Sequence, residues 1–95
     1  MASYNIPQLI SDLRELMAFP VEDKISLQEW YELSTSISNN IRSNPDLSNL
    51  CPEIVWHYLS DGDIRFKDSE YGQTQTKSLL AAIERLEIEY QNNLI

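Results

Sequence analysis

The chain has 95 residues and a net charge of −8, because 15 acidic residues outnumber seven basic ones. Leu, Ile, Val and Phe together supply 26 residues, which is enough apolar surface for a charged chain of this length to fold. This length favours a single helical domain over residues 1–95. One cysteine, Cys51, cannot form an internal disulfide, which excludes a disulfide-stapled secreted scaffold.

The charge and the apolar runs also limit the partners and the compartment. Nucleic-acid binding needs clustered Lys and Arg, but the closest bases, Arg65 and Lys67, lie among four acids, so we expect no nucleic-acid partner. The first residues do not combine a basic segment with an apolar run, as a signal peptide would. The longest apolar stretch, residues 79–83, is far shorter than the ~20 residues that span a bilayer. We therefore expect a cytoplasmic protein that does not enter a membrane.

The spacing of apolar residues predicts helices rather than strands, since few of them alternate with a period of two. A first helix is predicted over residues 6–19. Asn5 is its expected N-cap, Pro7 suits its first turn, and Pro20 ends it. One stripe at helical spacing contains its apolar residues: Ile6, Leu9, Ile10, Leu13, Leu16 and Met17.

A second helix is predicted to open at Ser26, because Ser26 and Glu29 have the spacing of a capping box. Its apolar face holds Leu27, Trp30, Leu33, Ile37 and Ile41. Residues 34–40 are rich in Ser, Thr and Asn, whose side chains compete for backbone hydrogen bonds, so we expect a bend or fraying there. Asn44, Pro45 and Asp46 should then form a turn.

A short third helix is predicted over residues 52–60, ended by the breaker at residues 61–63. Ile54, Val55, Tyr58 and Leu59 form its inner face, and Leu47 and Leu50 join them from the preceding loop. Next comes a single helical turn with Ile64 and Phe66 buried. The longest helix follows over residues 69–92, with an inner face of Tyr71, Leu79, Ala82, Ile83, Leu86 and Tyr90. The predicted fold class is all-α, a small bundle of three to five helices with a long C-terminal helix.

Candidate catalytic and metal-binding residues are few. Six residues along a helix would separate Cys51 from His57 by about 9 Å in rise and about 240° in rotation, whereas a nucleophile and its base must approach to about 3.2 Å. His57 and Asp61 share a helix face but have no third ligand nearby, and residues 61–63 lack the spacing of a calcium loop. We therefore expect no enzyme, no cofactor and no metal site.

Acidic pairs at i, i+3 spacing lie opposite the apolar stripe in three predicted helices: Asp12/Glu15, Glu29/Glu32 and Glu84/Glu87. If these faces share one side of the molecule, their field would steer a basic protein surface toward it. An ordinary solvated surface, which only keeps the chain soluble, is the alternative interpretation.

The last helix carries a second apolar face, because Ala81, Ile88 and Ile95 recur every seven residues with Leu80 beside them. A helix that is apolar on two sides either lies at the centre of its bundle or docks a partner. Trp56 lies off the inner face of the third helix, and Trp is enriched at interface hot spots, although a Trp at the edge of the core would give the same pattern.

These features predict a non-enzymatic, acidic protein–protein interaction module, acting as a regulator, inhibitor or adaptor for a protein partner with a basic surface. The predicted partner-binding residues are three apolar ones and a charged rim: Trp56, Leu80, Ile88, Asp61, Asp63, Glu84 and Glu87. The alternative is a structural protein that forms a homodimer through the second apolar face of the C-terminal helix.

Overall fold

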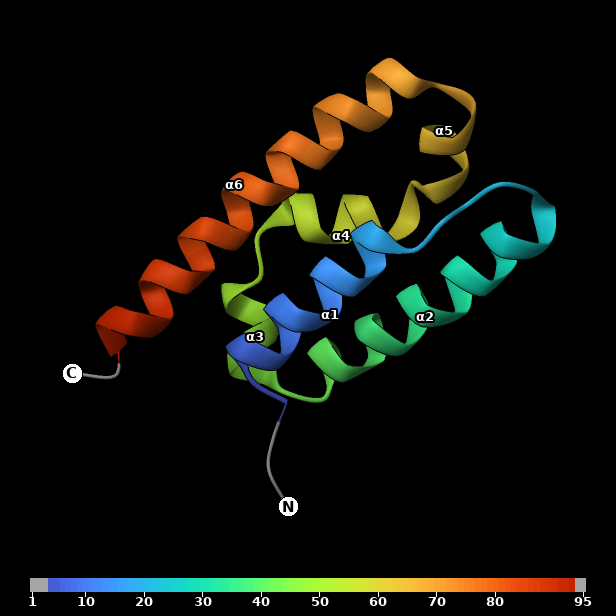
Figure 1. The fold of residues 1–95 in the computed structure, drawn as a ribbon. Coiled ribbons are helices and arrows are strands. Elements are labelled where there is room, and N and C mark those ends of the chain that lie inside the picture. The colour runs from blue at the N-terminus through green and yellow to red at the C-terminus, as the bar shows by residue number, and fades with distance from the viewer. Residues whose placement is uncertain (1–3, 94–95) are drawn as a thin grey trace.

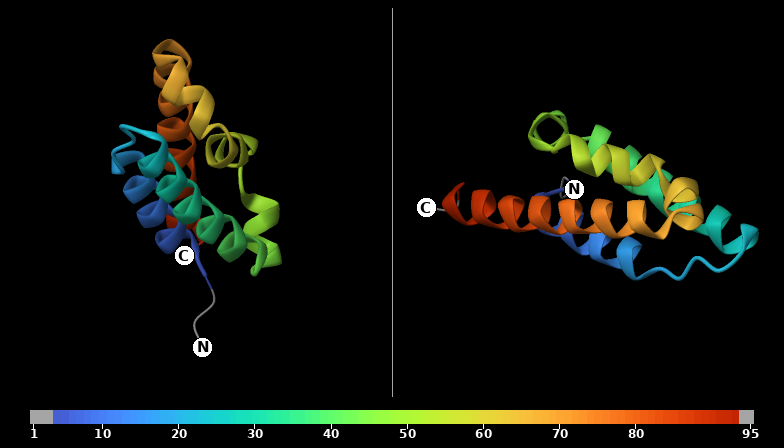
Figure 2. Two further views of the ribbon diagram at one scale, coloured as in Figure 1. Left: turned by 90° about the vertical axis from the view of Figure 1, so that its right-hand side faces the viewer. Right: turned by 90° about the horizontal axis from the view of Figure 1, so that it is seen from above.

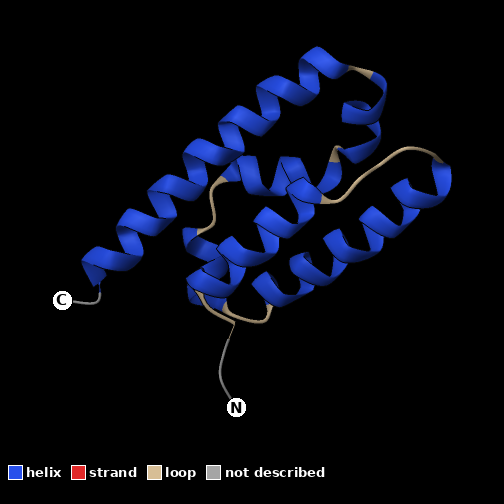
Figure 3. Cartoon of the chain, viewed as in Figure 1, coloured by secondary structure: helices blue, strands red, loops and turns tan. Residues whose placement is uncertain are grey.

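Six helices make up most of residues 4–93, the part of the chain that the computed structural model describes (Figures 1 and 3). They are α1 (Ile6–Ala18), α2 (Lys24–Arg42), α3 (Pro45–Leu50), α4 (Glu53–Ser60), α5 (Gly62–Lys67) and α6 (Ser69–Asn93). No strand occurs within this part, and the all-α prediction and the long C-terminal helix are confirmed. The number of helices exceeds the predicted three to five because α3 and α5 are separate helices of only six residues.

The two longest helices lie on opposite sides of the molecule, with α1 and α4 between them (Figure 1). On one side α6 packs against α1, α4 and α5, and on the other α2 packs against α1, α3, α4 and α5. The molecule measures 44 × 27 × 18 Å along its principal axes. Its length is largely that of α6, whose last turns extend beyond the other helices (Figure 2).

The core forms where the apolar stripes of α1, α2, α4 and α6 meet. Its most deeply buried side chains are Leu9, Leu13, Leu16, Ile37, Ile41, Val55, Leu79, Ile83 and Leu86. Each of them belongs to a stripe that the sequence predicts. Because burial of one such side chain contributes about 1.5–3 kcal/mol, this cluster supplies the main stabilisation of the fold.

Capping residues determine where the first two helices begin. Asn5 is the N-cap of α1, as predicted, and it exchanges hydrogen bonds of 3.0 Å with Gln8. In α2 the predicted capping box of Ser26 and Glu29 is wrong. Asp23 is the N-cap, its carboxylate accepts the Ser26 N–H at 2.8 Å, and the Ser26 hydroxyl accepts the Asp23 N–H in return. Asp and Ser are both favoured N-cap residues, and because Asp23 takes this role the helix begins three residues earlier than a cap at Ser26 would allow.

Residues 34–40 do not fray, because α2 is continuous from Lys24 to Arg42. Within this segment Ser34 is buried, and its hydroxyl donates a 2.6 Å hydrogen bond to the Leu59 carbonyl of α4. The hydroxyl is therefore occupied by a neighbouring helix and does not compete for the backbone of its own.

The two shortest helices also correct the sequence prediction. Asn44, expected in a turn, is the N-cap of α3, where Leu47 is buried but Leu50 is exposed. In α5 the predicted burial of Ile64 and Phe66 is wrong, since these side chains are 44% and 45% exposed. Six residues make less than two helical turns, so periodicity alone cannot show which face of such a helix turns inward.

Gly62 allows α5 to approach α2 closely. A Cβ atom at this position would lie 2.7 Å from Cζ3 of Trp30, a separation that requires one of them to move. The Trp30 ring is itself buried and packs edge-on against Tyr31. The contact therefore requires a residue without a side chain.

The two glycines of the chain provide a matched pair of substitutions. We expect Gly62→Ala to destabilise the protein by about 1–3 kcal/mol, because the buried Trp30 ring must shift. Gly72→Ala should stabilise it by about 0.4–1 kcal/mol, since the new Cβ would meet Arg65 at an ordinary 3.5 Å within a helix. Urea unfolding followed by circular dichroism measures both changes. Equal effects of the two substitutions would contradict the close approach at Gly62.

Candidate functional site

The outer face of α6 exposes the apolar residues that the second stripe predicted. Leu80 is 42% exposed and Ile88 is 57% exposed, and the exposed Ala81 and Glu84 lie between them in the sequence. Leu80 and Ile88 are about 12 Å apart along the helix. Ile95, the third member of the predicted repeat, lies outside the described residues.

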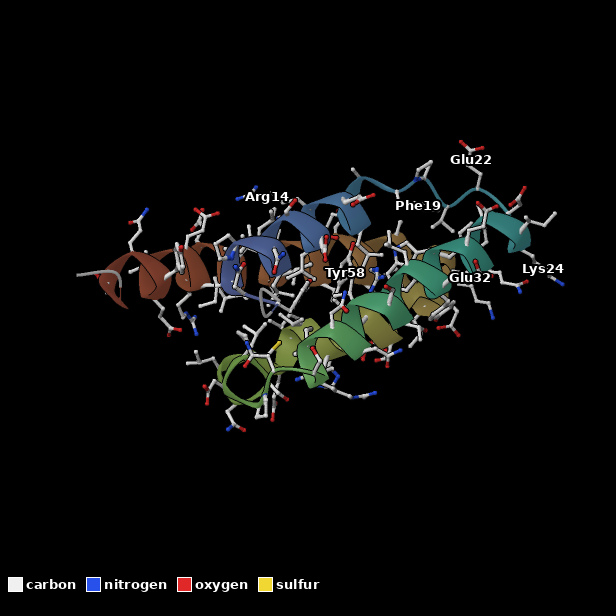
Figure 4. The ribbon with its side chains drawn as sticks, turned by 90° about the horizontal axis from the view of Figure 1, so that it is seen from below. Arg14, Phe19, Glu22, Lys24, Glu32 and Tyr58 are labelled. Carbon is white, nitrogen blue, oxygen red and sulfur yellow. The ribbon has the colours of Figure 1, made fainter. Side chains whose placement is uncertain are left out.

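Glu87 points toward α1, where it forms an ion pair with Arg14 at 2.5 Å. Both side chains remain largely solvated, and Arg14 lies at the surface in Figure 4. A solvated ion pair of this kind contributes about 0–1 kcal/mol. Glu84, by contrast, is exposed on the face that also carries Leu80 and Ile88.

Asp61 and Asp63 both have partners inside the molecule, at the corner where α4 meets α5. Asp61 accepts hydrogen bonds from the Tyr71 hydroxyl at 2.7 Å and from the Gln75 amide at 3.0 Å. These donors, Tyr71 first, hold the pKa of the Asp61 carboxyl below its ordinary value. Asp63 accepts a 2.9 Å hydrogen bond from the Tyr31 hydroxyl of α2. The two carboxylates therefore hold helices together at this corner.

Trp56 faces α2, on a different part of the surface from Leu80 and Ile88. The Arg42 guanidinium stacks on its ring, 5.3 Å from the ring centroid. Beside this pair is a surface depression of about 440 Å³ lined largely by Ser, Thr and Asn side chains of α2. The predicted contact residues thus lie on three separate parts of the surface. These are the outer face of α6, the corner with Asp61 and Asp63, and the depression beside Trp56.

The acidic pairs also divide between surfaces. Glu29 and Glu32 are exposed on α2 and Glu84 is exposed on α6, and these helices lie on opposite sides of the molecule. Asp12 is half-buried and accepts a 2.6 Å hydrogen bond from the Tyr4 hydroxyl. The carboxylates therefore do not form one continuous acidic face.

Cys51 and His57 lie in different surroundings. Cys51 caps the end of α3 and belongs to the buried core cluster, and burial raises the pKa of its thiol to about 11. His57 is exposed on α4. Within residues 4–93, no three His, Cys, Asp or Glu side chains are grouped closely enough to hold a metal ion.

Arg65 is the interior residue that sequence reasoning missed. Its guanidinium lies 3.6 Å from the ring centroid of Tyr58 and 4.8 Å from that of Trp30. Nη1 donates to the Tyr58 carbonyl at 2.8 Å and to the Gln75 side chain. Burial lowers the pKa of Arg65, but the guanidinium of an arginine keeps its charge in proteins. In the sequence Arg65 lies between Ile64 and Phe66, and the predicted burial of these two side chains implied that Arg65 would point into solvent.

Comparison of the chain with protein-family models, curated proteins and solved structures gives no match. None of the helices in the described part is long and apolar enough to cross a lipid bilayer.

The hydrogen bond from Tyr71 to Asp61 has a testable effect on acid stability. The folded pKa of Asp61 is below the unfolded value near 3.8, so the unfolded state binds more protons and this contribution to stability is lost as the pH falls below that value. Tyr71→Phe should raise the Asp61 pKa toward its ordinary value, as measured by NMR titration of the carboxyl carbon. An unchanged titration in this variant would contradict the assignment.

The Cys51 thiol should react slowly in the native protein. With a pKa of about 11, its thiolate fraction at pH 7 is roughly 300-fold below that of a free cysteine. A disulfide reagent that releases a coloured thiol should label it slowly at pH 7 and rapidly after unfolding in urea. Rapid labelling of the native protein would show that Cys51 is accessible and activated.

Proposed function

We propose that this protein is a small, non-enzymatic module that binds a protein partner through the outer face of α6, as a regulator, inhibitor or adaptor in the cytoplasm. The supporting observation is the exposure of Leu80 and Ile88 on a helix whose opposite face is fully committed to the core. The two side chains are spaced to lie along one groove of a partner, as in helix-in-groove recognition.

Charge favours a basic surface around the apolar contact. Glu84 lies between Leu80 and Ile88 in the sequence and is exposed with them, and the chain as a whole carries a net charge of −8. A basic partner would be attracted at long range and would pair with Glu84 on docking. Trp56, Asp61 and Asp63 lie elsewhere, and we assign them no part in this contact.

The exposed apolar residues also suggest homodimerisation through α6, and this is the second candidate function. A two-fold axis centred on the Leu80–Ile88 stripe, whether the helices run parallel or antiparallel, would bring the two copies of Glu84 together. Two carboxylates in a closing interface repel each other and lose solvation. The same residue that would attract a basic partner therefore opposes a dimer.

Paired substitutions on α6 and α2 test this proposal. The tagged chain would be used to capture partners from the host lysate, with the double variant Leu80→Ala, Ile88→Ala beside Ile25→Ala. Ile25 is 71% exposed on α2, so its loss is a matched control. We expect the unmodified chain and Ile25→Ala to retain one stoichiometric partner, and the α6 variant to bind it about 30-fold more weakly.

A second pair of variants tests the charge. Glu84→Gln should reduce both the capture of that partner and its dependence on salt, whereas Glu29→Gln on α2 should leave them unchanged. Light scattering of the unmodified chain over a range of concentrations tests the alternative. A dimer that the double variant on α6 dissociates would replace the module proposal, and equal loss of the partner in the α6 and α2 variants would refute the assigned surface.

A further inference from the structure

A cavity of about 350 Å³ opens between the end of α1, the segment that follows it, and α5. Most of its accessible surface is polar, although apolar and aromatic residues line much of it: Met17, Phe19, Val21, Trp30, Tyr58 and Phe66. Figure 4 shows Tyr58 in the interior and Phe19 on the segment between α1 and α2. The volume is at the lower end of the range of about 300–1,000 Å³ for small-molecule pockets.

Arg65 lines this cavity together with the two aromatic rings that flank its guanidinium. Its Cβ and Cγ lie beside Gly72 of α6, and the side chain extends from α5 past this glycine toward Tyr58 and Trp30. The ring of Tyr58 covers one face of the guanidinium at 3.6 Å from the ring centroid. The in-plane edges of the group are therefore left for hydrogen bonding.

One edge of the guanidinium is free. Both hydrogen bonds that Arg65 donates to described residues come from Nη1. All fully buried side-chain nitrogens and oxygens among residues 4–93 have a partner, so Nε and Nη2, which have none there, are not completely buried. Nε and Nη2 form the edge that binds a carboxylate through two parallel hydrogen bonds.

No carboxylate of the described residues occupies that edge, since the ion pair formed within residues 4–93 joins Arg14 to Glu87 instead. A half-buried cation is normally paired with an anion, because a lone charge loses solvation on burial. We propose that the cavity binds a small organic acid, with its single carboxylate on the Nε–Nη2 edge of Arg65 and its aromatic or aliphatic body against Met17, Phe19 and Phe66. This site is separate from the proposed docking face on α6 and does not depend on it.

The charge of the chain favours a ligand with one carboxylate, most strongly at low salt. A net charge of −8 repels anions at long range, and this repulsion grows with each charge that the ligand carries. Phosphate esters and dicarboxylates are therefore disfavoured. At about 0.15 M salt the screening length is about 8 Å, so distant carboxylates act weakly while a direct contact with Arg65 persists.

The two tryptophans supply an internal control for the test. Trp30 lines the cavity, whereas Trp56 lines the depression on the other side of α4. The ¹⁵N-labelled chain would be titrated with 3-phenylpropanoate at pH 7 in 0.15 M salt, and the two indole N–H signals followed by NMR. We expect the Trp30 indole and the Gly62 amide to shift with a common dissociation constant of about 1 mM, while the Trp56 indole stays fixed.

The contribution of the carboxylate is measured on the ligand and on the protein. The neutral analogue 3-phenylpropanamide should bind at least about tenfold more weakly. Arg65→Gln should weaken acid binding to the same extent, and Arg85→Gln, which removes an equal charge from an exposed position on α6, should leave it unchanged. If Arg65→Gln fails to fold, the comparison of acid and amide on the unmodified chain decides the result.

Three results would overturn the proposal. Equal affinity for the acid and the amide would remove the role of Arg65. Equal shifts of both indole signals would place the ligand elsewhere. A Trp30 signal that does not saturate at ligand concentrations tenfold above the expected dissociation constant would show that the cavity does not hold such an acid.

Discussion

A guanidinium half-buried among helices loses solvation on folding, so its faces and its N–H groups need partners in the protein. The rings of Tyr58 and Trp30 lie against the guanidinium of Arg65 and the Gln75 side chain accepts from its Nη1, while Nε and Nη2 have no partner among the described residues. These partners come from α4, α2 and α6, and Arg65 itself belongs to α5. One side chain therefore connects four helices, at the place where Gly62 brings α5 closest to α2.

The hydrogen bond from Arg65 to Gln75 is also linked to the hydrogen bonds of Asp61. Gln75 is 6% exposed, and it accepts from Arg65 while donating to Asp61 and to the Tyr71 hydroxyl. The carboxylate of Asp61 is thus part of an internal network whose members polarise one another. These hydrogen bonds orient the Asp61 carboxylate toward Tyr71 and Gln75, whereas Glu84 on the proposed docking face of α6 is exposed beside Leu80 and Ile88.

Periodicity predicted the elements in which a stripe extends over several turns. The fully buried residues of α1, α2, α4 and α6 all fall on such stripes, and the exposed face of α6 follows from the same spacing. Periodicity did not predict the orientation of the short helix α5. There the position of Arg65 depends on the rings of Tyr58 and Trp30, which are 7 and 35 residues away in the chain. The bond between Tyr31 and Asp63 spans 32 residues and has no local signal either. Spacing therefore predicts which helices form but not which polar side chains meet between them.

The last turns of α6 extend past the helices that support the rest of it (Figure 2). Unlike the turns around Leu79 and Ile83, which cannot open without breaking the core, this end loses little when its backbone hydrogen bonds break. Its amide protons should therefore exchange with solvent through local opening, and those near Leu79 only through unfolding of the whole chain. A partner held at Ile88 would have to order this end as it binds, and part of the binding energy would be spent on local folding.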